Sequence, residues 1–148
     1  MIRPTAKEFC AFVHTLDKML AENIDPAFFG SDVAMNEEVT RKDKRVEVRR
    51  KGTISLLGEW LALRYRTQND GAISEMLGTL RHIRKLRQRP AHALDNDVFD
   101  QGLIKEERDL MARAYRAVNI LRRILASHPA AKDFKAPPWI ESGEIYIV

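Results

Sequence analysis

The densest concentration of reactive side chains in the sequence lies between positions 81 and 92. This stretch, RHIRKLRQRPAH, holds five fixed cations and two imidazoles in twelve residues. An imidazole titrates near neutrality, so it can take a proton from a ribose 2′-hydroxyl or give one to a leaving 5′-oxygen. A guanidinium presents a planar set of donors to phosphate oxygens and stabilises the negative charge that develops on them. Arg87 and His92 are therefore candidates for metal-independent cleavage of a phosphodiester bond.

Helical spacing places two of the cations in this stretch on the apolar side of a helix expected over 73–86. Arg84 falls about 20° from Ile73 and Arg87 about 20° from Leu80 at the usual rotation per residue. A cation on that face must reach solvent, form an ion pair or line a cleft, because an unpaired buried charge costs several kcal/mol. The alternatives are a cleft that binds phosphate and an internal ion pair with one of three carboxylates, Glu75, Asp95 or Asp97.

Pro90 interrupts the same stretch and disfavours helical geometry at Arg89. We therefore expect the helix to end there and His92 to lie on the bend, close to Arg87. The segment from Arg87 to His92, RQRPAH, resembles the Arg-x(4–6)-His motif of the HEPN domain family. The whole chain of 148 residues resembles a small stand-alone HEPN protein, with the motif ahead of a long closing helix.

This resemblance implies a helical bundle that is commonly dimeric and, in catalytically active members, a metal-independent ribonuclease. It implies that Arg87 and His92 form the catalytic pair, that Gln88 fills the polar position of the motif, and that two motifs meet across a dimer cleft. We expect cleavage of single-stranded or looped RNA to 2′,3′-cyclic phosphate ends, with RNA bound by three neighbouring cations, Arg84, Lys85 and Arg89. Because the family is frequent in toxin–antitoxin and phage-defence systems, the expected partners include an antitoxin or regulatory protein.

Two other interpretations of the same residues stay open. One is a non-catalytic HEPN-like helical module that binds RNA, a nucleotide or a protein partner. The other is a helical interaction protein in which Arg84 and Arg87 are held in internal ion pairs. The catalytic interpretation also favours a homodimer, since one motif supplies one imidazole whereas concerted acid and base roles need two.

Four segments with helical periodicity must position these residues. The first, over about 5–22, begins with Thr5 and Glu8 at capping-box spacing, and a second follows the cap expected at Thr53. The third covers 73–86, and the fourth runs over 106–126 until Pro129 stops it. Between the first two, residues 39–48 alternate as a small hairpin would.

We predict an all-α fold over 1–148, a single domain built as an up-and-down four-helix bundle with a small β-hairpin and an extended C-terminal tail. The tail, 137–148, is expected to lie against the helices or to pair with the hairpin.

The composition narrows the class of protein without deciding its function. With 148 residues, 45% hydrophobic and 31% charged, the chain is of a size for one globular domain. It contains no apolar run near the roughly 20 residues that a membrane-spanning helix needs, and no secretory segment follows the first residues. Cys10 cannot form an internal disulfide, and the four His residues lack zinc-site spacing, so we expect a cytoplasmic protein without metal or cofactor. The net charge of +4 permits a polyanionic partner.

Overall fold

The computed structural model describes residues 5–67, 70–88, 99–135 and 137–138. Within these residues the chain is mostly helical, with one two-stranded antiparallel sheet, so the predicted helical class with a small hairpin is confirmed. No helix among the described residues is long and apolar enough to cross a membrane. The elements, in chain order, are α1 (Ala6–Glu22), η1 (Pro26–Phe29), β1 (Asn36–Thr40), β2 (Val46–Arg50), α2 (Thr53–Arg64), α3 (Gly71–Arg87), α4 (Gln101–Ala126) and η3 (Pro129–Ala131).

Local signals account for where the helices begin, with two corrections to the sequence-based expectation. Thr5 caps α1 as predicted, because its hydroxyl accepts a hydrogen bond from the backbone N–H of Glu8 at 3.3 Å. Thr53, in contrast, is the first residue of α2, and the cap position is held by Gly52 without a side-chain hydrogen bond. Helix α4 begins at Gln101, earlier than predicted, because the Asp100 carboxylate accepts from the backbone N–H of Gly102 at 2.8 Å.

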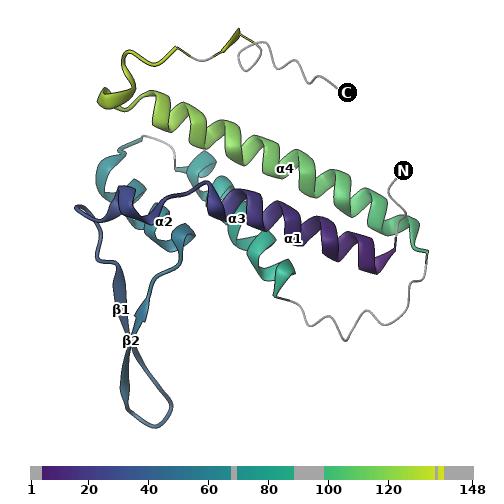
Figure 1. Ribbon diagram of the computed structural model, residues 1–148, viewed down its shortest axis with the longest axis horizontal. Helices are drawn as coiled ribbons and strands as arrows, with labels where there is room; N and C mark the ends of the chain where they lie inside the picture. The colour runs from purple at the N-terminus through teal and green to yellow at the C-terminus, as the bar shows by residue number, and fades with distance from the viewer. Residues whose placement is uncertain (1–4, 68–69, 89–98, 136, 139–148) are drawn as a thin grey trace.

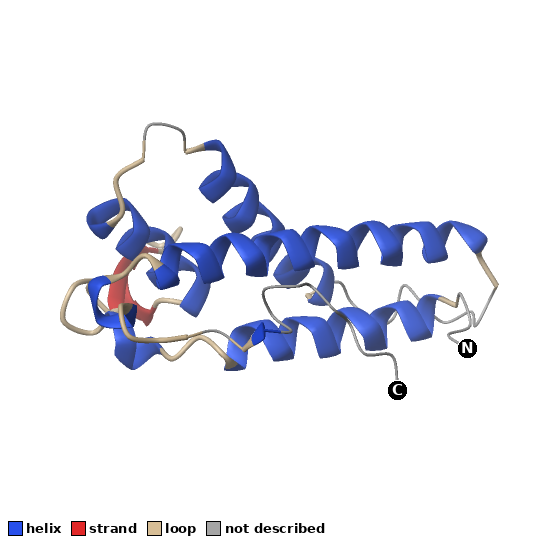
Figure 2. Cartoon of the chain, turned by 90° about the horizontal axis from the view of Figure 1, so that it is seen from above, coloured by secondary structure: helices blue, strands red, loops and turns tan. Residues whose placement is uncertain are grey.

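The predicted hairpin is confirmed as a separate arm of the molecule. Strands β1 and β2 pair antiparallel, and Lys44 takes a positive φ of 64° in the connection between them. Figures 1 and 2 place the arm at the end of the molecule that α2 occupies. Its charged side chains pair with one another, since Glu47 accepts hydrogen bonds from Arg41 at 2.6 Å and Arg49 at 3.0 Å. Two arginines of the arm therefore share one carboxylate, and Nε of Arg45 lies 3.7 Å from Oδ2 of Asp43.

Helix α3 lies at the centre of the packing and contributes to both hydrophobic clusters of the core. Its first half joins the cluster formed with α2, η1 and the end of α4 through three buried residues, Met76, Leu77 and Leu80. Its second half joins the cluster formed with α1 and the first half of α4 through Ile83 and Leu86. The basic end of α3 is thus anchored by apolar contacts immediately beside its arginines.

Helices α1 and α4 pack on α3 much more than on each other. They start at the same end of the molecule, where Thr5 and Phe99 form an isolated antiparallel bridge, and α3 runs against both (Figure 1). The apolar stripe predicted on α4 is real but only partly covered. Leu110 and Ala114 are buried, whereas Val118 and Leu125 are 45% and 37% exposed. The uncovered part of the stripe borders a groove between α1 and α4.

Candidate functional site

The two arginines predicted on the apolar side of α3 converge on one carboxylate of α1. The Nε atom of Arg84 donates to Oδ1 of Asp17 at 2.7 Å, and an Nη atom of Arg87 donates to Oδ2 at 2.6 Å. The Asp17 side chain is only 2% exposed, while those of Arg84 and Arg87 are 32% and 41% exposed. A buried carboxylate with one arginine on each oxygen fixes the direction of both guanidinium groups. Within the described residues, the structure shows no other side-chain hydrogen bond from either guanidinium, and both are partly exposed.

The local sequence explains why this cluster forms. Ile83 and Leu86 are buried beside the arginines, so the second half of α3 is pressed against α1. Asp17 lies within about 40° of Val13 on α1, and Val13 is buried in the same hydrophobic cluster. Asp17 therefore occupies a core-facing position that only the two arginines make tolerable, because an ionised carboxylate is strongly disfavoured in an apolar environment.

The ion pairs confirm one sequence-based alternative and correct its partner. Arg84 and Arg87 do pair within the chain, but with Asp17 rather than with Glu75, Asp95 or Asp97. Glu75 makes no ion pair within the described part of the chain, and the two aspartates lie outside it. The missed signal was a charged residue placed on the apolar face of the first helix.

Further positive charge surrounds the cluster. A cavity of about 190 Å³ lies between the end of α3 and the beginning of α2, and it is lined by Gly52, Thr53, Ile54, Ser55, Arg81, Arg84, Lys85 and Gln88. Arg81 and Lys85 have no ion-pair partner within residues 5–67, 70–88 and 99–135. The first backbone N–H groups of α2 add partial positive charge on the opposite wall. With one carboxylate shared between two arginines, the lining retains a net positive charge that suits an anion.

Three of the predicted site residues are placed together by this geometry. Arg84, Lys85 and Gln88 line the same cavity. Arg87 lies about one helical turn after Arg84 and donates to the same carboxylate, that of Asp17. Helix α3 ends at Arg87 with Gln88 as its C-cap, in line with the break predicted before Pro90. The other predicted residues, Arg89 and His92, lie outside the described residues. No group of three or more His, Cys, Asp or Glu side chains suited to a metal ion occurs in the described part of the chain.

A second carboxylate–arginine site lies at the other end of the molecule. Asp32, in the loop after η1, accepts hydrogen bonds from the Arg64 guanidinium and, at 3.0 Å, from the indole N–H of Trp60. The hydrogen bond from Arg64 lowers the pKa of Asp32 below its ordinary value, partial desolvation opposes this shift, and Trp60 adds to the lowering. The pair is one carboxylate to one guanidinium, so its charges cancel.

Comparison of the chain with known protein families, with curated proteins and with solved structures finds no match. The functional assignment therefore depends on the cationic end of α3 and its chemistry.

Proposed function

We propose that this protein is a metal-independent endoribonuclease of HEPN type that acts on single-stranded or looped RNA. The observation that carries the proposal is the Arg84–Asp17–Arg87 cluster, which holds two partly exposed guanidinium groups in fixed directions. Beside it lie Arg81 and Lys85, which form no ion pair within the described residues. A pre-oriented guanidinium stabilises developing phosphate charge better than a mobile one, because no reorganisation is needed during the reaction. Arg84, Lys85 and Arg89 would hold the RNA backbone, and Gln88 would occupy the polar position of the motif.

The proposed reaction uses His92 and Arg87 on a single phosphodiester. An imidazole accepts the proton of the ribose 2′-hydroxyl, the 2′-oxygen forms a bond to phosphorus, and the bond from phosphorus to the 5′-oxygen breaks. A protonated imidazole supplies the proton that the leaving 5′-oxygen requires. Arg87 neutralises charge on the phosphate oxygens in the transition state. A homodimer would supply both imidazoles, one from each copy of the motif.

Three further expectations belong to this function: the arrangement of the helices, the cellular setting and a partner protein. We propose a helical bundle in which α3 runs against α1 and α4 (Figure 1). Because α1 and α4 start at the same end of the molecule, they run in the same direction, which departs from the strict up-and-down alternation expected from the sequence. The setting is the cytoplasm, and an antitoxin or regulatory protein would hold the ribonuclease in check.

A second candidate function is favoured by one specific observation. Asp17 already occupies a donor of Arg84 and a donor of Arg87, which reduces the charge that either can direct to a reacting phosphate. A module that binds RNA without cutting it, or that binds a nucleotide or a protein partner, needs only the residual positive charge. In that case His92 has no catalytic role.

The test is cleavage of a fluorescently labelled RNA in the presence of EDTA. The purified protein is compared with Arg87→Ala and His92→Ala, and with Arg50→Ala as a control that removes an exposed cation from the hairpin. Circular dichroism and gel filtration first establish that each variant keeps the parent fold and oligomeric state. Analysis of the 3′ ends then identifies the product.

The ribonuclease proposal expects cyclic phosphate ends, loss of cleavage in both site variants and retention in the control. Cleavage that survives both substitutions would place the reaction elsewhere or in a contaminant, and would reject the assignment. RNA binding without cleavage, weakened by Arg87→Ala but unchanged by His92→Ala, would establish the binding module instead. Absence of both RNA binding and cleavage would reject the ribonuclease and the RNA-binding module, and would leave a nucleotide or a protein as the ligand of the module.

A further inference from the structure

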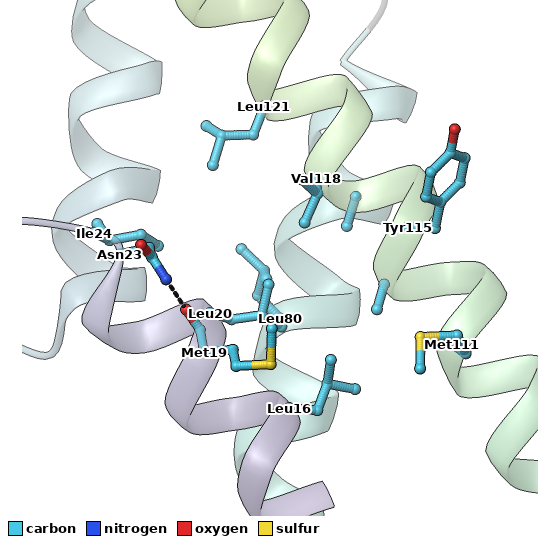
Figure 3. Close-up of a pocket in the computed structure, with 12 residues that line it drawn as sticks. Leu16, Met19, Leu20, Asn23, Ile24, Leu80, Met111, Tyr115, Val118 and Leu121 are labelled. Atoms are coloured by element: carbon cyan, nitrogen blue, oxygen red, sulfur yellow. Dashed lines mark hydrogen bonds between the residues drawn. The ribbon is translucent and has the colours of Figure 1, made fainter. Parts of the chain in front are cut away.

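A long apolar groove separates α1 from α4 on the face that α3 leaves open. The groove encloses about 410 Å³, and its lining is apolar apart from Asn23 and the Tyr115 hydroxyl (Figure 3). Leu80 of α3 and two small residues of α4, Ala114 and Ala117, line its buried part. Its rim is formed by Met19 of α1 and by Met111, Tyr115 and Val118 of α4, which are exposed. Met19 is 61% exposed although it lies on the apolar stripe of its helix.

The groove continues along α4 toward the end of that helix. A second cavity of about 520 Å³ shares Val118 and Leu121 with the first, and also contacts Ala131 and Phe134 from the chain that follows α4. Phe134 is 71% exposed and so is only partly accommodated there. Together these surfaces form one apolar track, which we call the α4 track, from Met111 to Phe134. Contiguous exposed apolar surface on one face of a protein is a common feature of binding surfaces.

The segment that follows α4 contacts this track. After α4 the backbone reverses through η3, and the described residues that follow run in the direction opposite to that of α4 (Figure 1). Phe134 already contacts the track, and ten more residues, 139–148, follow Pro138. The distance along α4 from Leu125 to Met111 is about 21 Å at the rise of an α-helix. Ten extended residues reach about 33 Å, which is enough to cover it.

The sequence of residues 139–148, WIESGEIYIV, suits an apolar track with a positive border. Six of the ten residues are apolar or aromatic, two are glutamates, and none is Lys or Arg. Residues 110–126 of α4 contain no carboxylate, and two of their arginines, Arg122 and Arg123, line the second cavity. Nε of Arg122, which lines the second cavity, is buried and has no hydrogen-bond partner among the residues that the structure describes. An acidic, apolar strand matches both features.

We propose that residues 139–148 bind in the α4 track as an intramolecular strap, with apolar side chains in the groove and Glu141 or Glu144 toward the arginines of α4. A second copy of the chain is a poorer occupant, because it would bring Arg122 and Arg123, which line the second cavity, toward the same arginines of its partner. This inference is independent of the ribonuclease proposal, whose dimer is expected at the motif end of α3.

Trp139 provides a direct readout of the strap. The chain has two tryptophans, Trp60 and Trp139, so Trp60→Phe leaves Trp139 as the only indole emitter. In this background we expect emission shifted to shorter wavelength than that of a free 139–148 peptide, at every protein concentration. Adding Val118→Asp places a negative charge in the track and should return the emission to that of the peptide. Adding Leu63→Asp, at a similarly exposed apolar residue of α2, should leave the emission unchanged.

A complementation experiment tests the same contact from the other side. A chain that stops after Pro138 should bind the labelled 139–148 peptide at least tenfold more tightly than the full chain does, and Val118→Asp should abolish that binding. Emission equal to that of the free peptide, or no binding to the shortened chain, would overturn the proposal. A blue shift that disappears on dilution would also overturn it, because it would identify a second copy as the occupant. Circular dichroism of each variant establishes that the helices are retained.

Discussion

Asp17 and Asp32 both hold arginine side chains of a helix to which they do not belong, and they do so in contrasting settings. Asp17 is 2% exposed and joins α1 to the end of α3, which is 67 to 70 residues further along the chain. The Asp32 side chain is 16% exposed and joins the loop after η1 to α2, at most 32 residues away. Asp17 therefore connects distant helices from inside the protein, whereas Asp32 supports a local unit formed with Trp60 and the phenylalanines of η1.

The stoichiometry of the two sites differs as much as their burial. One guanidinium faces Asp32, so that site is electrically balanced. Two guanidinium groups share Asp17, so a positive charge is left over, and it borders a cavity with two more cations. A site that serves stability alone gains nothing from the extra charge, because like charges repel. The comparison is consistent with a structural role for both aspartates, and we propose that the two arginines held by Asp17 have a binding role in addition.

The largest expected effect is the loss of stability on removing the buried carboxylate. Asp17→Ala deletes two charge-assisted hydrogen bonds and leaves two arginines beside the core, so we expect a loss of about 3 kcal/mol in the free energy of unfolding. Urea unfolding followed by circular dichroism measures it. The matched variant is Asp32→Ala, which should lose clearly less. Equal losses would contradict the contrast drawn between the two sites.

A triple substitution separates the structural role of the cluster from its binding role. Replacing Asp17 by Leu and both Arg84 and Arg87 by Met substitutes apolar side chains for the entire ion-pair network. Because a buried ionic network can be replaced by hydrophobic residues at little cost, most of the stability lost in Asp17→Ala should return. RNA affinity, measured by fluorescence anisotropy, should nevertheless fall at least tenfold. A triple variant that keeps full RNA affinity would remove the binding role from this cluster.

The salt dependence of RNA binding offers a finer comparison of single cations. Lys85 lines the cavity and has no ion pair within the described residues, so Lys85→Ala should reduce the slope of log K against log salt by somewhat less than one for single-stranded RNA. Arg64→Ala removes a cation that Asp32 already neutralises and should leave this slope unchanged. Binding titrations at several salt concentrations provide both slopes. A larger change for Arg64 than for Lys85 would move the RNA contact to the other end of the molecule.

Most of the elements could be predicted because their signals are local. The Thr5 cap and the apolar spacing behind it specify α1, and the alternation on either side of 42–45 specifies the hairpin. The beginning of α4 was missed because Asp100 ends the segment 95–100, DNDVFD, whose aspartates and asparagine are typical of a loop. Its side chain caps the helix instead.

The candidate site shows where such prediction stops. Periodicity placed Arg84 and Arg87 on the apolar side of α3, which required a partner or a cleft, but it could not identify Asp17. The choice of partner depends on which helix packs against α3, and that is decided by contacts distant in the sequence. The groove illustrates the same limit. Periodicity placed Val118 and Met19 on the apolar faces of their helices, but it could not predict which parts of those faces a neighbouring helix covers.

The smallest expected effect is the pH dependence of the stability that Asp32 contributes. Because Arg64 lowers the pKa of Asp32 in the folded protein, ionised Asp32 contributes stability that is fully present above the ordinary aspartate pKa of 3.8. That contribution is lost as the pH falls below 3.8 through the lower pKa of the folded state.

The Asp32→Asn variant lacks this contribution at every pH, whereas all other carboxylates are common to both proteins and cancel in the comparison. The difference in urea midpoint between the native protein and Asp32→Asn should therefore be constant from pH 7 to pH 5 and should shrink toward pH 3. A difference that stays constant over the whole range would show that Asp32 acts through neutral hydrogen bonding, and the electrostatic contrast with Asp17 would then not hold.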